Sequence, residues 1–565
     1  MKRFFAALAA AISPVIPRAV SLTLALALVI TLMAGCSSAG SSGAPTNHDS
    51  YYYNEGGTAS QSASAAPSAS ASQGDSGMYQ AAPYEGWRYV PVDGTEEYAA
   101  APESPFKDAK INPLSTFSAD VDTASYSNMR RFIKEGQEPV GIRIEELVNY
   151  FDYSYPAPVA GYGHPFSIST EIGACPWESD HLLAMIGIQG ARLGNTENIA
   201  NNIVFLIDVS GSMNAENKLP LVIDSMKLLM EQLDGNDRIS IVTYAGSDRV
   251  IADSVPGNET RELKRMVNNL SAGGSTAGAR GLRTAYDLAA KNYIDGGNNR
   301  VILATDGDFN VGESNVDALT ELIENERDRG VYISVLGFGM GNLKDNMMEA
   351  IAANGNGNYA YIDTIQEAKK VLVDEFDSTM FTIAKDVKLQ VEFNPETVSA
   401  YRLIGYETRR LEDEDFNDDL KDAGDIGSGH NVTAFYELVL AENRGEGESD
   451  STDPLVDPLK YSSSVTTGSD DFMTVKVRYK APEGRDSMLV EHVVGADALD
   501  ARLSDNFVFA SAVAEFGLIV SGSDYREDSS LRRVVSRAED ALGRDEYGLR
   551  AEFLELVQEY ARIAG

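Results

Sequence analysis

Short apolar runs and amphipathic stretches alternate between residues 199 and 380 of the chain. The runs have the length of buried strands, and the stretches between them repeat apolar residues at helical spacing. Apolar strands that alternate with helices indicate a mostly parallel sheet covered on both faces. The pattern therefore predicts a central α/β domain of the doubly wound, Rossmann-like class, with strands over 203–207, 239–244, 301–304, 331–338 and 359–362 and helices over 219–233, 278–290 and 316–329.

The chain on either side of this domain follows a strand pattern instead. Period-two alternation predicts strands over 166–172 and 182–188, and later over 387–393, 431–440 and 473–479. Because the ends of an inserted domain usually lie close together, we expect the two groups to pair, which makes the central domain an insertion into a β-rich domain. Helical spacing predicts helices within 118–134 and 143–152 and a tail of helices over about 505–563, which packs on this unit or forms a bundle of its own.

The first 35 residues have the pattern of an export signal. Basic residues precede the apolar segment 21–35, which is shorter than the roughly 20 residues of a membrane span. The sequence Met33-Ala34-Gly35-Cys36 resembles a bacterial lipobox, which implies cleavage before Cys36 and a lipid on its sulfur. We therefore expect a lipid-anchored, extracytoplasmic protein at the cell surface or in the periplasm; a plain anchor helix with an incidental cysteine is the alternative.

Composition divides the rest of the chain into a linker and folded parts. Residues 36–103 are rich in Ser, Ala and Tyr without a helix or strand period, which predicts a flexible tether. The expected domains are an N-terminal region over 104–198 with helices followed by strands, the central domain over 199–380, and a C-terminal β-rich and helical domain over 381–565.

Charge and cysteine content narrow the function further. The net charge of −38 argues against nucleic acid as a partner, because a phosphate backbone would be repelled. Apart from Cys36 the chain has one cysteine, Cys175, so the mature chain cannot form an internal disulfide. Because the segment 173–178 around it holds no histidine, Cys175 is expected to be a buried structural thiol.

Small oxygen-bearing residues end the first and third central strands. Asp208, Ser210 and Ser212 follow the run 203–207, and Asp306 follows the run 301–304. Thr276 lies in a glycine-rich loop that opens a helix. Because ligands of doubly wound sheets bind at the carboxyl ends of the strands, these side chains are expected to converge. Two carboxylates and three hydroxyls, without sulfur or imidazole, suit Mg²⁺ or Mn²⁺ rather than zinc.

The pattern of two serines and an aspartate with a downstream threonine and aspartate resembles the metal-ion-dependent adhesion site of von Willebrand factor type A domains. The segments at 115–126, 143–153, 175–177 and 429–438 resemble a bacterial family of envelope lipoproteins that carry such a domain between an N-terminal associated region and a C-terminal domain of unknown function. The resemblance implies that Ser210 and Ser212 bind the metal directly. It also implies that a carboxylate of the partner completes the coordination.

Other sites in the sequence fit less well. The segment from Asp306 to Asp317 lacks the glycine and glutamate of a calcium-binding EF-hand loop. None of the five histidines lies in the central domain, so a hydrolase triad is not expected there. Asp120 and Asp122 are either a helix N-cap or cation ligands, and the N-cap requires less.

The sequence thus predicts a membrane-tethered module that captures an acidic residue of an envelope or extracellular protein through its divalent cation. The alternative is an envelope assembly scaffold in which the metal is only structural. Enzymatic activity is not expected, because no general base is identifiable beside the metal carboxylates.

Overall fold

The computed structural model describes residues 88–91, 96–100, 102–159, 163–194, 199–275, 278–307, 316–441, 468–482 and 484–564. The predicted signal peptide 1–35, the predicted lipidation site Cys36, most of the predicted tether and the predicted metal ligand Thr276 lie outside the described residues. The chain divides after Gly77, and all described elements belong to the second unit, Met78–Gly565.

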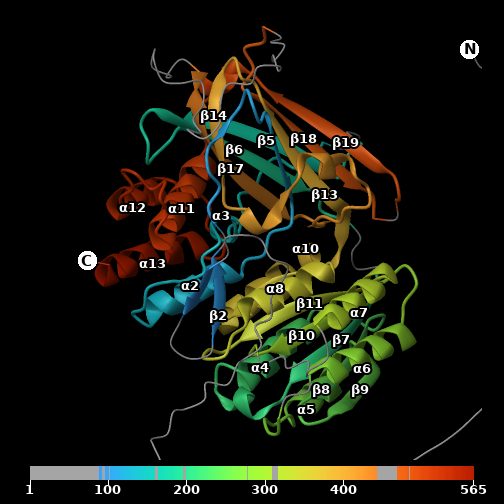
Figure 1. The fold of residues 1–565 in the computed structure, drawn as a ribbon. Coiled ribbons are helices and arrows are strands. Elements are labelled where there is room, and N and C mark those ends of the chain that lie inside the picture. Colours follow the sequence, from blue (N-terminus) through green and yellow to red (C-terminus); the bar gives the residue numbers. More distant parts are fainter. Residues whose placement is uncertain are drawn as a thin grey trace, which may run out of the picture. The chain divides into compact units, whose positions relative to one another are not determined.

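The central domain is built on a six-stranded sheet in the order β12-β11-β10-β7-β8-β9 (Figure 1). All neighbouring strands are parallel except β8 and β9, which are antiparallel. The predicted doubly wound fold is confirmed, while the edge strand β9 is an addition that the sequence pattern did not indicate. The strands are β7 (Asn201–Asp208), β8 (Arg238–Tyr244), β9 (Asp248–Pro256), β10 (Asn298–Thr305), β11 (Val331–Phe338) and β12 (Tyr359–Ile362).

Helices cover both faces of this sheet because its strands are apolar on both faces. Along β7, Val204 and Leu206 enter one core, whereas Ile203, Phe205 and Ile207 enter the other. The first core is closed by α6 (Gly278–Lys291), α7 (Val316–Asp328) and α8 (Asp345–Asn354), and the second by α4 (Leu219–Met230), α5 (Thr260–Val267) and α9 (Ile365–Lys369). A short π-helix (Lys370–Asp374) and α10 (Phe376–Met380) follow α9.

The flanking strands form two sheets around a shared apolar core. In one sheet β6 pairs with β17 along their length, for example Ile186 with Ala434, so strands from both sides of the central domain are direct neighbours. The predicted insertion of the central domain is confirmed by this pairing. One sheet contains β3 (Lys107–Asp108), β14 (Val398–Ile404), β17 (Asn431–Leu440), β6 (His181–Gly190) and β5 (Phe166–Ala174); the other contains β15 (Arg410–Leu411), β4 (Leu114–Ser118), β13 (Thr382–Phe393), β16 (Ile426–Gly427), β18 (Met473–Lys480) and β19 (Ser487–Val494).

The predicted helical tail packs on this unit and shares a core with the N-terminal helices. That core joins α2 (Ala124–Lys134), α3 (Ile144–Val148), α11 (Asp505–Ser521), α12 (Leu531–Asp540) and α13 (Leu549–Ile563) to one face of β6 and β17. Helix α11 begins where the Ser504 hydroxyl accepts from the Phe507 N–H at 3.1 Å and ends at Gly522 in the left-handed conformation. Across the described ranges, no helix has both the length and the apolar character that a membrane crossing needs.

Two expectations for the N-terminal part are wrong. The short sheet of β1 (Arg88–Pro91) and β2 (Glu97–Ala100) lies inside the range predicted as tether, and Tyr98 is buried against Phe132. The region after residue 104 also begins with β3 and β4 rather than with helices. These strands show no period-two pattern, because β1, β2 and β3 are very short and four consecutive residues of β4 are buried.

Candidate metal centre

The carboxylate of Asp208, at the end of β7, is completely buried. Its Oδ1 accepts from the Ser210 N–H at 2.8 Å, and its Oδ2 accepts from the Thr305 hydroxyl at 3.3 Å. Because β7 and β10 are parallel neighbours in register, Thr305 leaves its strand beside Asp208. The next residue, Asp306, is also completely buried. Both predicted aspartates therefore stand at the same edge of the sheet. At this edge β7 lies between β10 and β8, where the strand order reverses, and ligands of doubly wound sheets bind at such a point.

The two predicted serines lie together on the turn after β7. Their hydroxyl oxygens are 2.9 Å apart. Ser210 is buried, whereas Ser212, in the 3₁₀ helix Gly211–Asn214, is exposed. The pair therefore presents two hydroxyl oxygens next to a buried carboxylate, with one of the two open to solvent.

The glycine-rich loop that leads to Thr276 is fastened to this turn. The Gly273 N–H donates to the Val209 carbonyl at 2.8 Å, and the Gly211 N–H donates to the Gly274 carbonyl at 3.1 Å. The described residues just before Thr276 thus lie against the serine turn, while Thr276 itself is outside the described residues.

Glycine is required where the chain leaves Asp306. Gly307 has φ of +104°, and a Cβ there would lie 2.6 Å from the Asn342 carbonyl oxygen. Any other residue would force the β10 exit away from the loop that follows β11. This close approach brings Asn342 to the edge of the site.

Lys218, directly before α4, is a site residue that sequence reasoning did not single out. Its ammonium donates to Oδ2 of Asp306 at 2.8 Å and to Oδ1 of Asn342 at 2.9 Å. In the sequence Lys218 only precedes a predicted helix, and nothing there indicates that it turns toward Asp306. The contact depends on the fold of the β11 loop.

The electrostatics of the site favour a bound cation. Burial is the main cause that raises the pKa of Asp208 to about 6, and the negative charge of Asp306 raises it further, while hydrogen bonds from Ser210 lower it. Ionising Asp208 therefore costs more than ionising a solvent-exposed carboxyl, and a cation bound beside it would offset this cost. Oxygen-only donors with two carboxylates fit a hard divalent cation such as Mg²⁺ or Mn²⁺. The chain's own residues thus suit the group that the sequence predicts.

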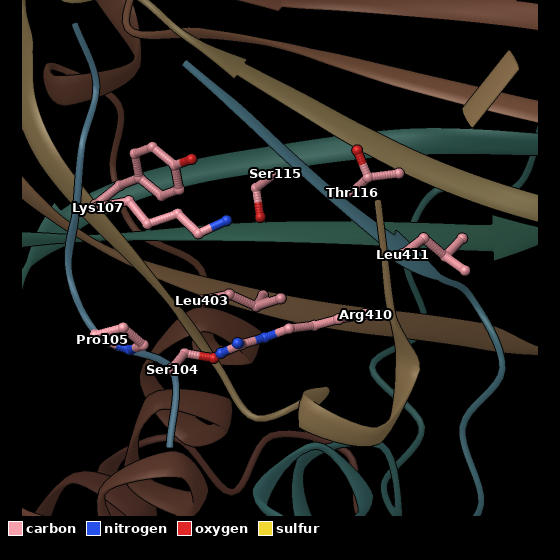
Figure 2. A pocket seen from close by; sticks show the side chains of 9 residues that line it. Ser104, Pro105, Lys107, Ser115, Thr116, Leu403, Arg410 and Leu411 are labelled. Carbon is pink, nitrogen blue, oxygen red and sulfur yellow. The ribbon is translucent and has the colours of Figure 1, made fainter. Parts of the chain in front are cut away.

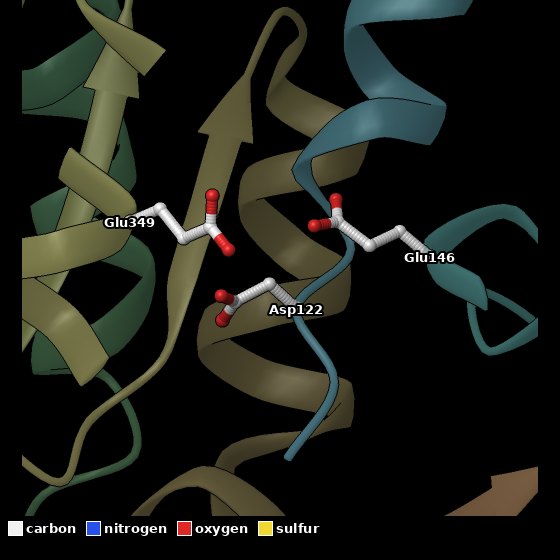
Figure 3. Close-up of side chains that lie close together, drawn as sticks. All are labelled: Asp122, Glu146 and Glu349. Carbon is white, nitrogen blue, oxygen red and sulfur yellow. The ribbon is translucent and has the colours of Figure 1, made fainter. Parts of the chain in front are cut away.

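A second group of acidic side chains lies between α2, α3 and α8. One carboxylate oxygen from each of Asp122, Glu146 and Glu349 lies within 4.8 Å of the others, and all three residues are buried (Figure 3). Asp122 does not cap α2 as expected, because the N-cap is Thr123, without a side-chain bond. Instead, Oδ1 of Asp122 accepts from the Tyr359 N–H at 2.7 Å, which fixes the loop before α2 to β12.

Two arginines supply the positive charge for this second group. Arg409 lies 2.9 Å from Asp122 and 3.3 Å from Glu349, and Arg143 pairs with Glu146 and, at 3.5 Å, with Glu349. These two guanidinium groups offset part of the negative charge, and between them they pair with all three carboxylates. We therefore interpret the cluster as an ion-pair joint between the central domain and its flanking regions, not as a metal centre.

A small cleft opens between β3 and β14 of one sheet and β4 and β15 of the other (Figure 2). Its volume of about 30 Å³ holds roughly two water molecules. Lys107, Arg410 and Thr116 are among the residues that line it, and the Thr116 hydroxyl donates a hydrogen bond to Oδ1 of Asp413. Because the lining residues carry positive charges and include no carboxylate, the cleft suits a small anion and has no ligand set for a divalent cation.

The remaining cysteine has the environment that the sequence indicates. Cys175 is buried beside Trp177 in the helical core. Burial is the main cause that raises the pKa of its thiol to about 12, and the charge of Glu437 adds to this. A thiol that stays protonated is a poor nucleophile.

Three family models match most of the part of the chain that the structure describes. Residues 92–185 match the family described as "von Willebrand factor", residues 202–374 match "von Willebrand factor type A domain", and residues 378–563 match "Uncharacterized protein YfbK, C-terminal". The chain is 40% identical over 481 residues to "Uncharacterized protein YfbK" of Escherichia coli (strain K12), an alignment that covers 83% of this chain and 82% of that protein.

More distant similarities involve the central part of the chain. The human inter-alpha-trypsin inhibitor heavy chain H3 is 25% identical over 261 residues, which are 43% of this chain and 29% of that protein. A solved structure of von Willebrand factor type A from Catenulispora acidiphila matches with 15% identity and a TM-score of 0.38, covering 69% of this chain and 88% of the other.

Proposed function

This chain belongs to the family of Escherichia coli YfbK, with a central von Willebrand factor type A domain and the C-terminal domain of that family, and we propose that it binds a partner protein through a divalent cation held by this domain. Domains of this type generally act as interaction modules rather than as enzymes. The observation that carries the proposal is the meeting of Asp208, Ser210, Ser212 and Asp306 at one edge of the sheet.

Each residue has a distinct part in the proposed site. The Ser210 and Ser212 hydroxyls are 2.9 Å apart and serve as neutral ligands. Asp208 and Asp306 supply the negative charge from buried positions. Ser212 is exposed, so a carboxylate from outside can reach the same cation. When bound, Mg²⁺ or Mn²⁺ would supply an open coordination position for an Asp or Glu of the partner.

A pull-down from envelope extract tests the proposal. The chain serves as bait in Mg²⁺, in chelator, and as the variant Asp208→Ala. The matched control is Asp328→Ala, which removes a carboxylate that is 69% exposed, at the end of α7 and away from the site. We expect proteins that are retained by wild type and by the control in Mg²⁺ but are absent in chelator and with Asp208→Ala. Equal retention in all samples would contradict the proposal.

The same variants address the alternative of an envelope scaffold with a structural metal. In that case Asp208→Ala would lower the thermal unfolding temperature yet keep its partners. Calorimetric titration with Mg²⁺ completes the comparison, because the proposed site requires that wild type and Asp328→Ala bind the ion and that Asp208→Ala does not.

We also propose that Cys36 carries a lipid that tethers the protein to a membrane on its extracytoplasmic side. The support is the Met33-Ala34-Gly35-Cys36 sequence after an apolar segment. Metabolic labelling with a radioactive fatty acid should mark wild type and leave Cys36→Ser unlabelled and released from the membrane fraction. Labelling of Cys36→Ser, or its continued membrane association, would contradict the tether.

A further inference from the structure

Lys218 brings a positive charge of the chain itself to the metal centre. Its Nζ lies 2.8 Å from Oδ2 of Asp306 and 2.9 Å from Oδ1 of Asn342. The Lys218 side chain is only 8% exposed and that of Asp306 is fully buried. A buried ion pair of this kind is held in one geometry and is poorly screened by salt. The contact therefore differs from a surface lysine that passes near a carboxylate.

The surrounding backbone is shaped to hold this side chain. Gly339, just after β11, has φ of +70°, and a Cβ there would lie 2.3 Å from Cγ of Lys218. The Gly339 carbonyl accepts from the Tyr361 hydroxyl at 2.6 Å, which fixes the loop in place. Further along the loop, the Gly341 N–H donates to Glu96, which pairs with Arg131 at 3.0 Å. The lysine stem thus lies in a slot that the loop keeps open.

The charges at the site decide what this lysine does to a divalent cation. Asp208 and Asp306 are two buried carboxylates, and the ammonium offsets one of their negative charges. A divalent cation at the same edge is repelled by the ammonium and shares Asp306 with it. Both effects weaken the attraction between the site and the ion.

We propose that Lys218 is a resident cation that lowers the affinity of the metal centre for Mg²⁺ and holds Asp306 in place when no ion is bound. The inference rests on the proposed function, because it concerns the same site. Its consequence is that cation binding, and with it partner capture, follows the external Mg²⁺ concentration instead of being permanent. Lys218 acts on the ion through its charge and through its hold on Asp306, and is therefore a positioning residue.

The test measures Mg²⁺ affinity by calorimetry on the full chain with three substitutions. Lys218→Met keeps most of the stem and removes the charge, Lys218→Gln removes the charge but keeps a hydrogen-bond donor on a shorter stem, and Lys218→Arg keeps the charge. We expect Lys218→Met and Lys218→Gln to bind Mg²⁺ at least about tenfold more tightly than wild type, and Lys218→Arg to bind it within about threefold of wild type. Thermal unfolding in chelator and in Mg²⁺ is the second readout. In chelator, Lys218→Met and Lys218→Gln should unfold at a lower temperature than wild type, and Mg²⁺ should raise their unfolding temperature by more than it raises that of wild type.

The outcomes separate this inference from the proposed function. If wild type binds Mg²⁺ and neither Lys218→Met nor Lys218→Gln binds it more tightly, the role of Lys218 is refuted and the metal site stands. If only Lys218→Met and Lys218→Gln bind Mg²⁺, the role of Lys218 is supported and Mg²⁺-dependent capture by wild type is refuted. If no variant binds Mg²⁺, both are refuted. Equal tightening by Arg would also refute the role of charge.

Discussion

Replacing Arg409 by methionine tests whether the ion-pair joint stabilises the contact between the central domain and its flanking regions. Arg409 closes the 3₁₀ turn Glu407–Arg409, and its guanidinium lies 3.1 Å from Asp120, 2.9 Å from Asp122 and 3.3 Å from Glu349. The first two carboxylates precede α2, and the third lies on α8 of the central domain. Methionine keeps most of the apolar stem and removes the charge, so the change isolates the electrostatic contribution.

The magnitude follows from the burial of the partners. The Arg409 side chain is 11% exposed and that of Asp122 is 2% exposed. Removing one member of a buried ion pair costs about 3–5 kcal/mol, because the other charge is left without a partner. Burial raises the pKa of Asp122, the charge of Asp120 raises it further, and Arg409 lowers it. Without Arg409 this pKa rises further, so an ionised Asp122 destabilises the folded variant more than it destabilises wild type, and the deficit of the variant is expected to be larger at pH 8 than at pH 5.

Urea unfolding followed by the fluorescence of the buried Trp177 measures the effect at both pH values. The matched control is Arg410→Met, since Arg410 is the next residue and is exposed; we expect it to change the unfolding free energy by less than about 0.5 kcal/mol. The double variant with Asp122→Asn should recover part of the loss. Wild-type stability of Arg409→Met, or losses that simply add in the double variant, would refute the reasoning.

Three further predictions concern stability elsewhere in the chain. Burial, with the charges of Glu407 and Glu146, raises the pKa of Glu145 to about 8, so wild type loses stability as pH rises from 5 to 9. Glu145→Gln should exceed wild type at pH 9 by on the order of a few kcal/mol and match it at pH 5 in urea titrations; parallel curves would contradict this. A Cβ on Gly427 would lie 1.7 Å from the Ser378 carbonyl oxygen, so Gly427→Ala should melt well below Gly194→Ala, whose Cβ meets nothing within 4 Å; equal melting temperatures would be inconsistent with the packing. Ser504→Ala removes the cap of α11 and should lose about 1 kcal/mol or more, whereas Ser530→Ala, at a helix start without a side-chain cap bond, should lose less; the reverse order would contradict the role of the cap.

The sequence predicted those parts of the fold in which many residues share one pattern. The run before Asp208 is apolar on both faces, and the structure places alternate residues of β7 in two cores. The same regularity brought Asp208 and Asp306 to one edge, since parallel strands end together. Strands β6 and β17 were also identified from their alternation.

What the sequence did not predict depends on single contacts between distant segments. Lys218 reaches Asp306 only because glycine at position 339 leaves room for its stem. Arg409 meets Asp122 across 287 positions of the chain, and no local pattern marks such a pair. Buried charges of this kind follow from tertiary geometry, so charge runs and periodicity do not identify them.

The pairing of β6 with β17 imposes an order on folding. The paired residues are roughly 250 positions apart, and closing so long a loop in an unfolded chain carries a large entropic penalty that slows the search. A central domain that has already folded holds its two ends near each other and acts as a short link instead. A folded central domain therefore favours assembly of the two sheets around it, and the register between β6 and β17 can form only after the segment 431–440 has been synthesised.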